Sequence, residues 1–143
     1  MKIGRKIVFG LIAVAMPLII GGIFYYIFCP EVYFVKVIDN YTKLNMHIST
    51  NLYGNMWLRI LRYHMFDYLW AFAFTNALFL VFDNSNKEIW GSCICSVLVG
   101  SVLEVFQLVG ITNGTFDIWD ILLEMLGAFT ATFIIKSIRR KGK

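Results

Sequence analysis

The sequence predicts an all-α polytopic membrane protein, a bundle of about four transmembrane helices with an outer interfacial segment. Of its 143 residues, 59% are hydrophobic and only 15% are charged, and the mean hydropathy is +0.69. Soluble domains carry roughly 25% charged residues, so a water-soluble fold of this length could not hide so much apolar surface. Four long apolar segments, separated by polar or turn-forming residues, complete the prediction.

The four predicted spans form a single transmembrane domain, and each supplies the roughly 20 apolar residues that a bilayer core of about 30 Å requires. They cover about residues 7–28, 63–82, 89–110 and 116–138, with an outer connection over about 30–62. Pro17 and the pair Gly21-Gly22 are tolerated in membrane helices and are candidates for a kink in the first span. This span is longer than a signal-peptide core and lacks a clear small-x-small cleavage site, which favours an uncleaved helix.

The distribution of Lys and Arg predicts the orientation. Nine of the 13 basic residues fall on the side of the two termini, which places both termini in the cytoplasm and the connections 31–62 and 111–115 outside. The net charge of +4 is better explained by this bias in an anionic membrane than by nucleic acid binding. No nucleic acid partner is expected, because no motif that reads RNA or DNA is present.

The outer connection of about 30 residues is long for a structureless loop. It interleaves aromatic residues with Lys36, Arg59 and Arg62, a composition expected at a membrane interface. Two interpretations fit this pattern equally. One is a helix that begins near Asn55 and runs into the second span, and the other is a solvated loop with interfacial anchors.

Five acidic residues lie in or beside the last three spans, and the predicted orientation brings all of them near the outer leaflet. Small residues, Gly100 and Gly127, continue the acidic faces of two helices and would let the helices approach closely. A charge inside the bilayer is costly, so such residues usually face a cavity, a partner or a proton. The candidate ligand-binding residues, several of which share a helix face by their spacing, are His64, Asp67, Glu104, Gln107, Asp117, Asp120 and Glu124.

Several of these residues also have simpler interpretations. Asp117 and Asp120 could cap the fourth span, where a carboxylate accepts backbone N–H bonds and complements the helix dipole. Asp67 could form an interfacial ion pair with one of three nearby side chains, those of Arg59, Arg62 and His64.

Glu104 and Glu124 sit at no helix end, which favours a functional polar pocket over protonated, hydrogen-bonded acids. His64 can share a face with Asp67 and could accept a proton or bind a metal, although a lone interfacial histidine more often has no special role. A hard cation such as Mg²⁺ or Ca²⁺ could use the carboxylates. Nothing in the sequence defines such a geometry, so no metal or cofactor is predicted.

Other classes of chemistry lack their motifs. The chain has no phosphate-binding glycine loop, no Gly-x-Ser-x-Gly and no His-Glu-x-x-His. Cys29, Cys93 and Cys95 do not have the spacing of a zinc site and are interpreted as ordinary buried thiols. Acids and a histidine suffice for acid–base or metal-assisted chemistry, but no nucleophile constellation favours an enzyme, so the sequence decides neither for nor against one.

The polar residues of the last two spans resemble the VanZ-like family of small bacterial integral membrane proteins. The likeness rests on Glu104-x-x-Gln107, then Gly114-Thr115-Phe116-Asp117-Ile118-x-Asp120, and Gly127. Asp67-x-x-Trp70 resembles a related branch, whereas Glu124 stands where the family often has Asn. The resemblance implies a bacterial plasma membrane protein with a cell-envelope role, since the family's namesake is associated with reduced susceptibility to the glycopeptide teicoplanin.

The leading hypothesis is a cell-envelope protein whose outer-facing acidic pocket binds or modifies a lipid-linked or polar envelope molecule and affects susceptibility to glycopeptide-type antibiotics. Its expected partner is a membrane lipid or a lipid-linked envelope molecule. One alternative is a small proton- or cation-coupled transporter in which Glu104 and Glu124 exchange protons or cations. Four spans are few for that role, so a homodimer would be needed. Another alternative is a non-enzymatic accessory subunit, with carboxylates that hold the bundle together.

Overall fold

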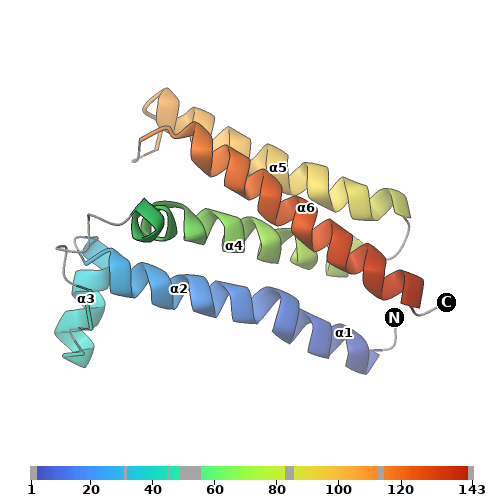
Figure 1. The fold of residues 1–143 in the computed structure, drawn as a ribbon, viewed down its shortest axis with the longest axis horizontal. Helices are drawn as coiled ribbons and strands as arrows, with labels where there is room; N and C mark the ends of the chain where they lie inside the picture. Colours follow the sequence, from blue (N-terminus) through green and yellow to red (C-terminus); the bar gives the residue numbers. More distant parts are fainter. Residues whose placement is uncertain are drawn as a thin grey trace.

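Long helices packed side by side form the molecule, and one short helix lies across an end of the bundle (Figure 1). The computed structural model describes residues 3–30, 32–44, 46–48, 56–82, 86–112 and 115–141, and within these ranges it contains helices and no strand. The all-α prediction is therefore confirmed. In chain order the elements are α1 (Ile3–Gly10), the π-helical turn η1 (Leu11–Ala15), α2 (Met16–Phe28), α3 (Tyr33–Thr42), α4 (Met56–Phe82), α5 (Asn86–Leu108) and α6 (Ile118–Lys141).

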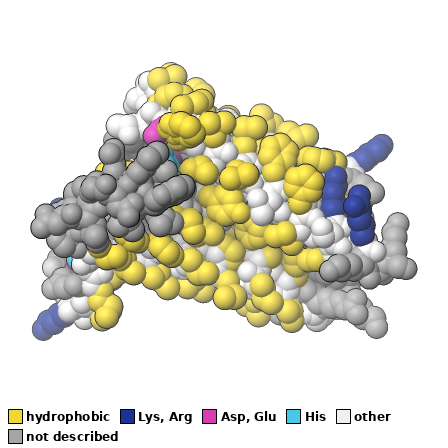
Figure 2. Space-filling view, viewed as in Figure 1, with side chains coloured by type: hydrophobic (Ala, Val, Ile, Leu, Met, Phe, Trp, Pro, Cys, Tyr) yellow, Lys and Arg dark blue, Asp and Glu magenta, His cyan; other side chains and the backbone are white. Residues whose placement is uncertain are grey.

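Four helical segments are long and apolar enough to cross a membrane, so the chain is a multi-pass membrane protein. They are Val8–Phe28, Tyr63–Phe82, Lys87–Leu108 and Ile118–Arg140, which correspond closely to the predicted spans. Hydrophobic side chains cover the middle of the face shown in Figure 2, and basic side chains gather at the end where the two termini lie. Residues 83–85, between the second and third spans, and residues 113–114 of the predicted outer connection 111–115 lie outside the described part of the chain.

The two ends of the bundle differ in what they carry. Both termini lie at one end, which we call the termini end (Figure 1). The other end, which we call the α3 end, carries α3, the end of α2, the beginning of α4, the end of α5 and the beginning of α6. The acidic residues highlighted by the sequence all belong to this α3 end or to the first turns below it.

Helix α4 is the centre of the bundle, because it packs against α2, α5 and α6. Small side chains are fully buried on both α4 and α6: Ala71, Ala128 and Ala131. Gly127 lies at the closest approach, where a Cβ atom would collide with the carbonyl oxygen of Tyr68 on α4. Small residues allow helices to approach closely in a membrane, where packing rather than hydrophobicity drives association.

The first span is one continuous rod made of α1, η1 and α2, and it packs mainly on α4. The backbone N–H of Met16 donates to the carbonyl oxygen of Leu11, five residues earlier. Pro17 follows directly. Proline has no N–H to donate and its ring clashes with the carbonyl four residues before it, so the wider π-helical turn accommodates it inside a helix. Near the termini end, the rings of Phe9 and Phe79 meet edge to face at 6.2 Å.

The connection between the first two spans contains two helical parts. Helix α4 begins at Met56, in agreement with the helix expected from near Asn55. Helix α3 was not predicted as a helix, although Tyr33 and Phe34, two of the aromatic residues that marked the segment as interfacial, lie on it. Its Tyr33 and Tyr41 are more than four-fifths exposed while Val35 is buried, so α3 has one face on the protein and aromatic side chains available for the membrane interface.

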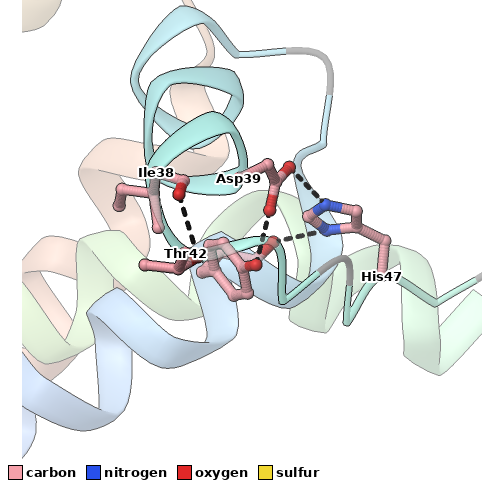
Figure 3. A network of polar contacts seen from close by, with 5 residues as sticks. Ile38, Asp39, Thr42 and His47 are labelled. Carbon is pink, nitrogen blue, oxygen red and sulfur yellow. Dashed lines mark hydrogen bonds and ion pairs between the residues drawn. The ribbon is translucent and has the colours of Figure 1, made fainter.

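A polar network ties α3 to the end of α2 (Figure 3). The Tyr26 hydroxyl donates to Asp39 Oδ1 at 2.5 Å, and His47 Nε2 lies 2.7 Å from Asp39 Oδ2. His47 Nδ1 lies 3.1 Å from the carbonyl oxygen of Tyr26, which can only accept a hydrogen bond. The imidazole of His47 therefore bridges the carbonyl oxygen of Tyr26 and the carboxylate of Asp39. None of these three residues was predicted from the sequence to have a role.

The network makes the packing of α3 dependent on pH. The Tyr26 hydroxyl, and after it His47, hold the pKa of Asp39 below its ordinary value of 3.8. A lowered pKa in the folded state means that Asp39 stabilises α3 above its unfolded-chain pKa and stops doing so as the pH falls through the lowered folded value. We expect the amide protection of residues 33–48, measured by hydrogen exchange and corrected for intrinsic rates, to be constant down to about pH 4 and to fall below it.

The matched variant is Asp39→Asn, which cannot titrate. Its segment 33–48 should be less protected than the wild type at neutral pH, and the protection should show no further loss in acid from this site. Equal protection of Asp39→Asn and the wild type at neutral pH would show that the network does not hold α3.

Candidate functional site

The predicted site residues gather at the α3 end of the bundle and come from three helices. Helix α4 contributes two of them, α5 two, and the beginning of α6 the remaining three. The acids of different helices lie within electrostatic range of one another: Asp67 interacts with Asp120, Glu124 and Glu104, and Glu124 with Glu104 and Asp120. We call Asp67, Glu104, Asp120 and Glu124 the carboxylate cluster. Acidic and histidine side chains are visible at this end between hydrophobic ones (Figure 2).

A histidine joins α4 to α6 in this cluster. His64 Nδ1 lies 2.6 Å from Asp120 Oδ1, and both side chains are less than one-fifth exposed. Asp67, one turn after His64, completes a group of three in which one ligand atom from each residue lies within 4.8 Å of the others. The sequence suggested an ion pair between His64 and Asp67, whereas the hydrogen-bonded partner of His64 is Asp120. The side chains of Arg59 and Arg62, the other suggested partners of Asp67, lie outside the described part of the structure.

Glu104 holds the end of α5 to the beginning of α6. Its Oε1 accepts a hydrogen bond from Gln107 Nε2 at 3.1 Å, and its Oε2 accepts one from the backbone N–H of Asp117 at 3.2 Å. The side chain is 6% exposed. Both carboxylate oxygens therefore face N–H donors, the arrangement that suits an ionised carboxylate. Gln107 acts as a donor to Glu104, one turn away on the same face.

Glu124 lies deeper in the bundle and is held differently. It is also 6% exposed, but its Oε2 is buried without a hydrogen-bond partner. Its carboxylate occupies the space that a side chain at Gly100 of α5 would fill, because a Cβ atom there would collide with it. The absence of a side chain at Gly100 thus makes room for a carboxylate between α5 and α6.

Asp117 caps α6, which was the simpler interpretation of this residue. Its Oδ1 accepts the backbone N–H of Trp119 at 2.9 Å, the second residue of the helix. A carboxylate at this position satisfies a free backbone donor and complements the positive end of the helix dipole. Asp117 therefore lies at the rim of the site, and its carboxylate is engaged by a backbone N–H of α6.

This geometry makes a testable prediction about Asp117. Replacement by alanine should destabilise the protein by about 0.5–2 kcal/mol, the usual cost of losing an N-cap. Asp117→Asn keeps an oxygen acceptor and should stay close to the wild type. Both are measured by thermal unfolding of the purified protein in detergent, and an Asn variant as unstable as the Ala variant would contradict the capping role.

The interior below the cluster contains polar groups that were not predicted from the sequence. Thr75 Oγ1 and Asn76 Oδ1 of α4 are buried without a hydrogen-bond partner. Ser96 of α5 is fully buried and donates to the carbonyl oxygen of Ala71 across the helix interface at 3.3 Å. Ser92 and Thr132 are also buried. A spacing of four residues from Glu104 through Gly100 to Ser96 and Ser92 was a signal that could have revealed this polar face.

No protein-family model, curated protein or solved structure matches the chain.

Proposed function

We propose that the chain is a protein of the bacterial plasma membrane, with both termini in the cytoplasm, that binds a membrane lipid or lipid-linked envelope molecule at the carboxylate cluster. One observation carries the proposal: acids from three helices gather at the α3 end of a membrane-spanning bundle. A charged side chain within such a bundle costs free energy unless it faces a cavity or binds a partner. The excess of Lys and Arg toward the termini end supports the orientation. The sequence motifs that resemble the VanZ-like family support an envelope role.

The surroundings of the cluster suit an amphiphilic ligand. Where α5 ends and the connection to α6 begins, the apolar side chains of Leu108, Val109 and Ile111 are exposed. The side chain of Trp119, in the first turn of α6, is exposed too. An acyl chain or isoprenoid could lie against these side chains while its head group reaches the acids. The cluster gathers four carboxylates, and among the described side chains the imidazole of His64 is the basic group in contact with them, so charge complementarity favours a head group that carries an amine.

The proposal is tested by the lipid preference of the purified protein. The full chain is reconstituted into nanodiscs of phosphatidylglycerol mixed with phosphatidylethanolamine, and retained lipids are identified by native mass spectrometry after detergent release. We expect retention of the amine-bearing lipid by the wild type and its loss in the double variant Asp67→Asn/Asp120→Asn. Asp39→Asn removes an acid at the same end outside the cluster and serves as the control.

Each outcome has a distinct meaning. Equal lipid retention by the wild type and the double variant would overturn the proposal. Lower thermal stability of the double variant without any change in lipid preference would favour an accessory subunit whose acids hold the bundle together. In cells, we expect glycopeptide susceptibility to differ between strains that express the wild type and Asp120→Asn at equal levels.

A second candidate, a small proton- or cation-coupled carrier, is favoured by the polar interior below the cluster. Three buried oxygen atoms without hydrogen-bond partners, on Thr75, Asn76 and Glu124, lie on α4 and α6, and the buried Ser92 and Ser96 face the same interior from α5. Unsatisfied polar groups are costly inside a membrane protein and often belong to ion or proton pathways. Such a carrier would work as a homodimer.

The carrier is tested in liposomes that contain a pH-sensitive dye. An imposed pH gradient should collapse faster with the wild type than with Glu124→Gln, and chemical cross-linking should show dimers in the same vesicles. Gradient decay equal to that of protein-free liposomes would exclude a proton pathway.

A further inference from the structure

Three side chains at the α3 end have the composition and the proximity of a metal site. One imidazole and two carboxylates, from His64, Asp67 and Asp120, offer ligand atoms that all lie within 4.8 Å of one another. Ligands of one tetrahedral zinc ion lie roughly 3.3 Å apart, as follows from metal–ligand distances of about 2.0–2.2 Å. Small side-chain rotations would bring the three atoms to this spacing, and the 2.6 Å contact between His64 and Asp120 would open slightly.

The backbone already provides much of the order that such a site needs. His64 and Asp67 are one turn apart on α4, and Asp120 lies in the first turn of α6. The close packing of α4 on α6 at Gly127 holds these two helices at a short distance. All three side chains are partly buried, so an ion would be shielded on the helix side and open on the other.

Glu124 is a second, independent observation that points to a cation. It lies one turn below Asp120 on α6, is nine-tenths buried, and has a carboxylate oxygen without a hydrogen-bond partner. It is within electrostatic range of Asp120, and Asp67 interacts with it in turn. Several carboxylates that share one low-dielectric region repel one another, and a divalent cation removes that repulsion directly.

We propose that His64, Asp67 and Asp120 bind one divalent transition-metal ion such as Zn²⁺, with Glu124 as a buried acid within electrostatic range that adds negative charge. Imidazole nitrogen selects for such ions over Mg²⁺ and Ca²⁺, which prefer oxygen ligands alone. Three protein ligands leave a further coordination position for water or a ligand. The inference rests on the proposed function only in that both use the carboxylate cluster.

The experiment measures metal binding by the full chain in detergent, purified without a polyhistidine tag and stripped with a chelator. Zn²⁺, Mn²⁺ and Mg²⁺ are titrated separately by calorimetry, and Co²⁺ is added as a spectroscopic probe. We expect one Zn²⁺ per chain, and we expect Mg²⁺ to bind at least about 100-fold more weakly than Zn²⁺. The Co²⁺ spectrum should show ligand-field bands without a thiolate charge-transfer band, which excludes the three cysteines as ligands.

Matched variants locate the ion. The chain has two histidines, so His64→Ala should lower the Zn²⁺ affinity at least about 100-fold while His47→Ala leaves it unchanged. Asp117→Asn, which alters the neighbouring cap, should also bind normally. Glu124→Gln should lower the affinity by less than His64→Ala does, because it removes a nearby negative charge and no ligand. Unchanged thermal unfolding of each variant without metal shows that the fold is intact.

Three results would overturn the inference: no stoichiometric Zn²⁺ binding, equal binding by His64→Ala and the wild type, or a loss of binding in His47→Ala alone. The proposed function is tested separately, by measuring the lipid preference of the metal-free protein. If the metal-free protein retains the amine-bearing lipid but binds no metal, only this inference fails. If it binds Zn²⁺ through His64 and shows no lipid preference, the inference stands and the proposed function fails.

Discussion

Replacing Gly127 with leucine is expected to abolish the folded bundle. A single Cβ atom at this position would already overlap the carbonyl oxygen of Tyr68, and it would lie 3.1 Å from the backbone nitrogen of Phe72. These are backbone atoms of α4, which cannot rotate away as a side chain can, so α4 and α6 would have to separate. Gly127→Ala should cost about 1–3 kcal/mol or more, the usual cost of overpacking, and leucine should exceed what the fold can absorb.

The measurement is size-exclusion chromatography in detergent, followed by thermal unfolding of the protein that elutes as a single species. Gly91→Leu is the control. It introduces the same side chain into a membrane-spanning helix at a position where an added Cβ atom meets nothing within 4 Å. A Gly127→Leu protein that elutes and unfolds like Gly91→Leu would show that the helices do not approach as closely as described.

Removal of the Glu104 carboxylate is expected to have the next largest effect. Glu104→Ala leaves the backbone N–H of Asp117 and the amide of Gln107 without their acceptor, and it leaves a cavity in a buried position. A loss of about 2–5 kcal/mol in the free energy of unfolding is expected from these two causes. Hydrogen exchange should show the loss first in the connection from α5 to α6, because Glu104 ties its two sides together.

Glu104→Gln separates the role of the hydrogen bonds from that of the charge. The glutamine oxygen can accept the N–H of Asp117, and a flip of the Gln107 amide then presents an oxygen to the new NH₂ group. We therefore expect Glu104→Gln to unfold close to the wild type. If it is as unstable as Glu104→Ala, the negative charge and not the hydrogen bonds holds the connection.

Membrane-spanning helices were the most predictable part of the fold. Polar groups are costly in lipid, so each membrane-spanning helix appears in the sequence as a long apolar segment. The predicted segment 63–82 has the same bounds in the structure, Tyr63–Phe82. Helix α3 has no such apolar segment. Its ten residues mix polar and aromatic side chains, and its position depends on hydrogen bonds from Tyr26 and His47, which lie outside the helix. Pro17 indicated a distortion of the first span, but whether this distortion takes the form of a π-helical turn depends on packing against α4.

The candidate site was predictable within each helix and not between helices. Helical spacing correctly placed Glu104 beside Gln107 and Asp120 one turn from Glu124, because residues three or four apart share a face. The partner of Glu104 across the connection is a backbone N–H, which every residue carries, so no residue type could have revealed it. His64 hydrogen-bonds to Asp120 rather than to its neighbour Asp67 because α6 lies directly beside α4. The ligand-binding role of these residues and the likeness to the VanZ-like family stay predictions.

The π-helical turn in the first span helps to keep one contact face of this helix turned toward the bundle. Ala13, Pro17 and Gly21 are buried at intervals of four residues, and Phe9 continues this series. In a regular α-helix, residues four apart turn by about 400°, so this face would drift by roughly 120° between Phe9 and Gly21. The wider turn reduces the rotation per residue and cancels part of that drift. Deletion of one residue within Leu11–Ala15 would swing Phe9 by about 100° away from Phe79, so the number of residues in this segment constrains the bundle as much as their identity does.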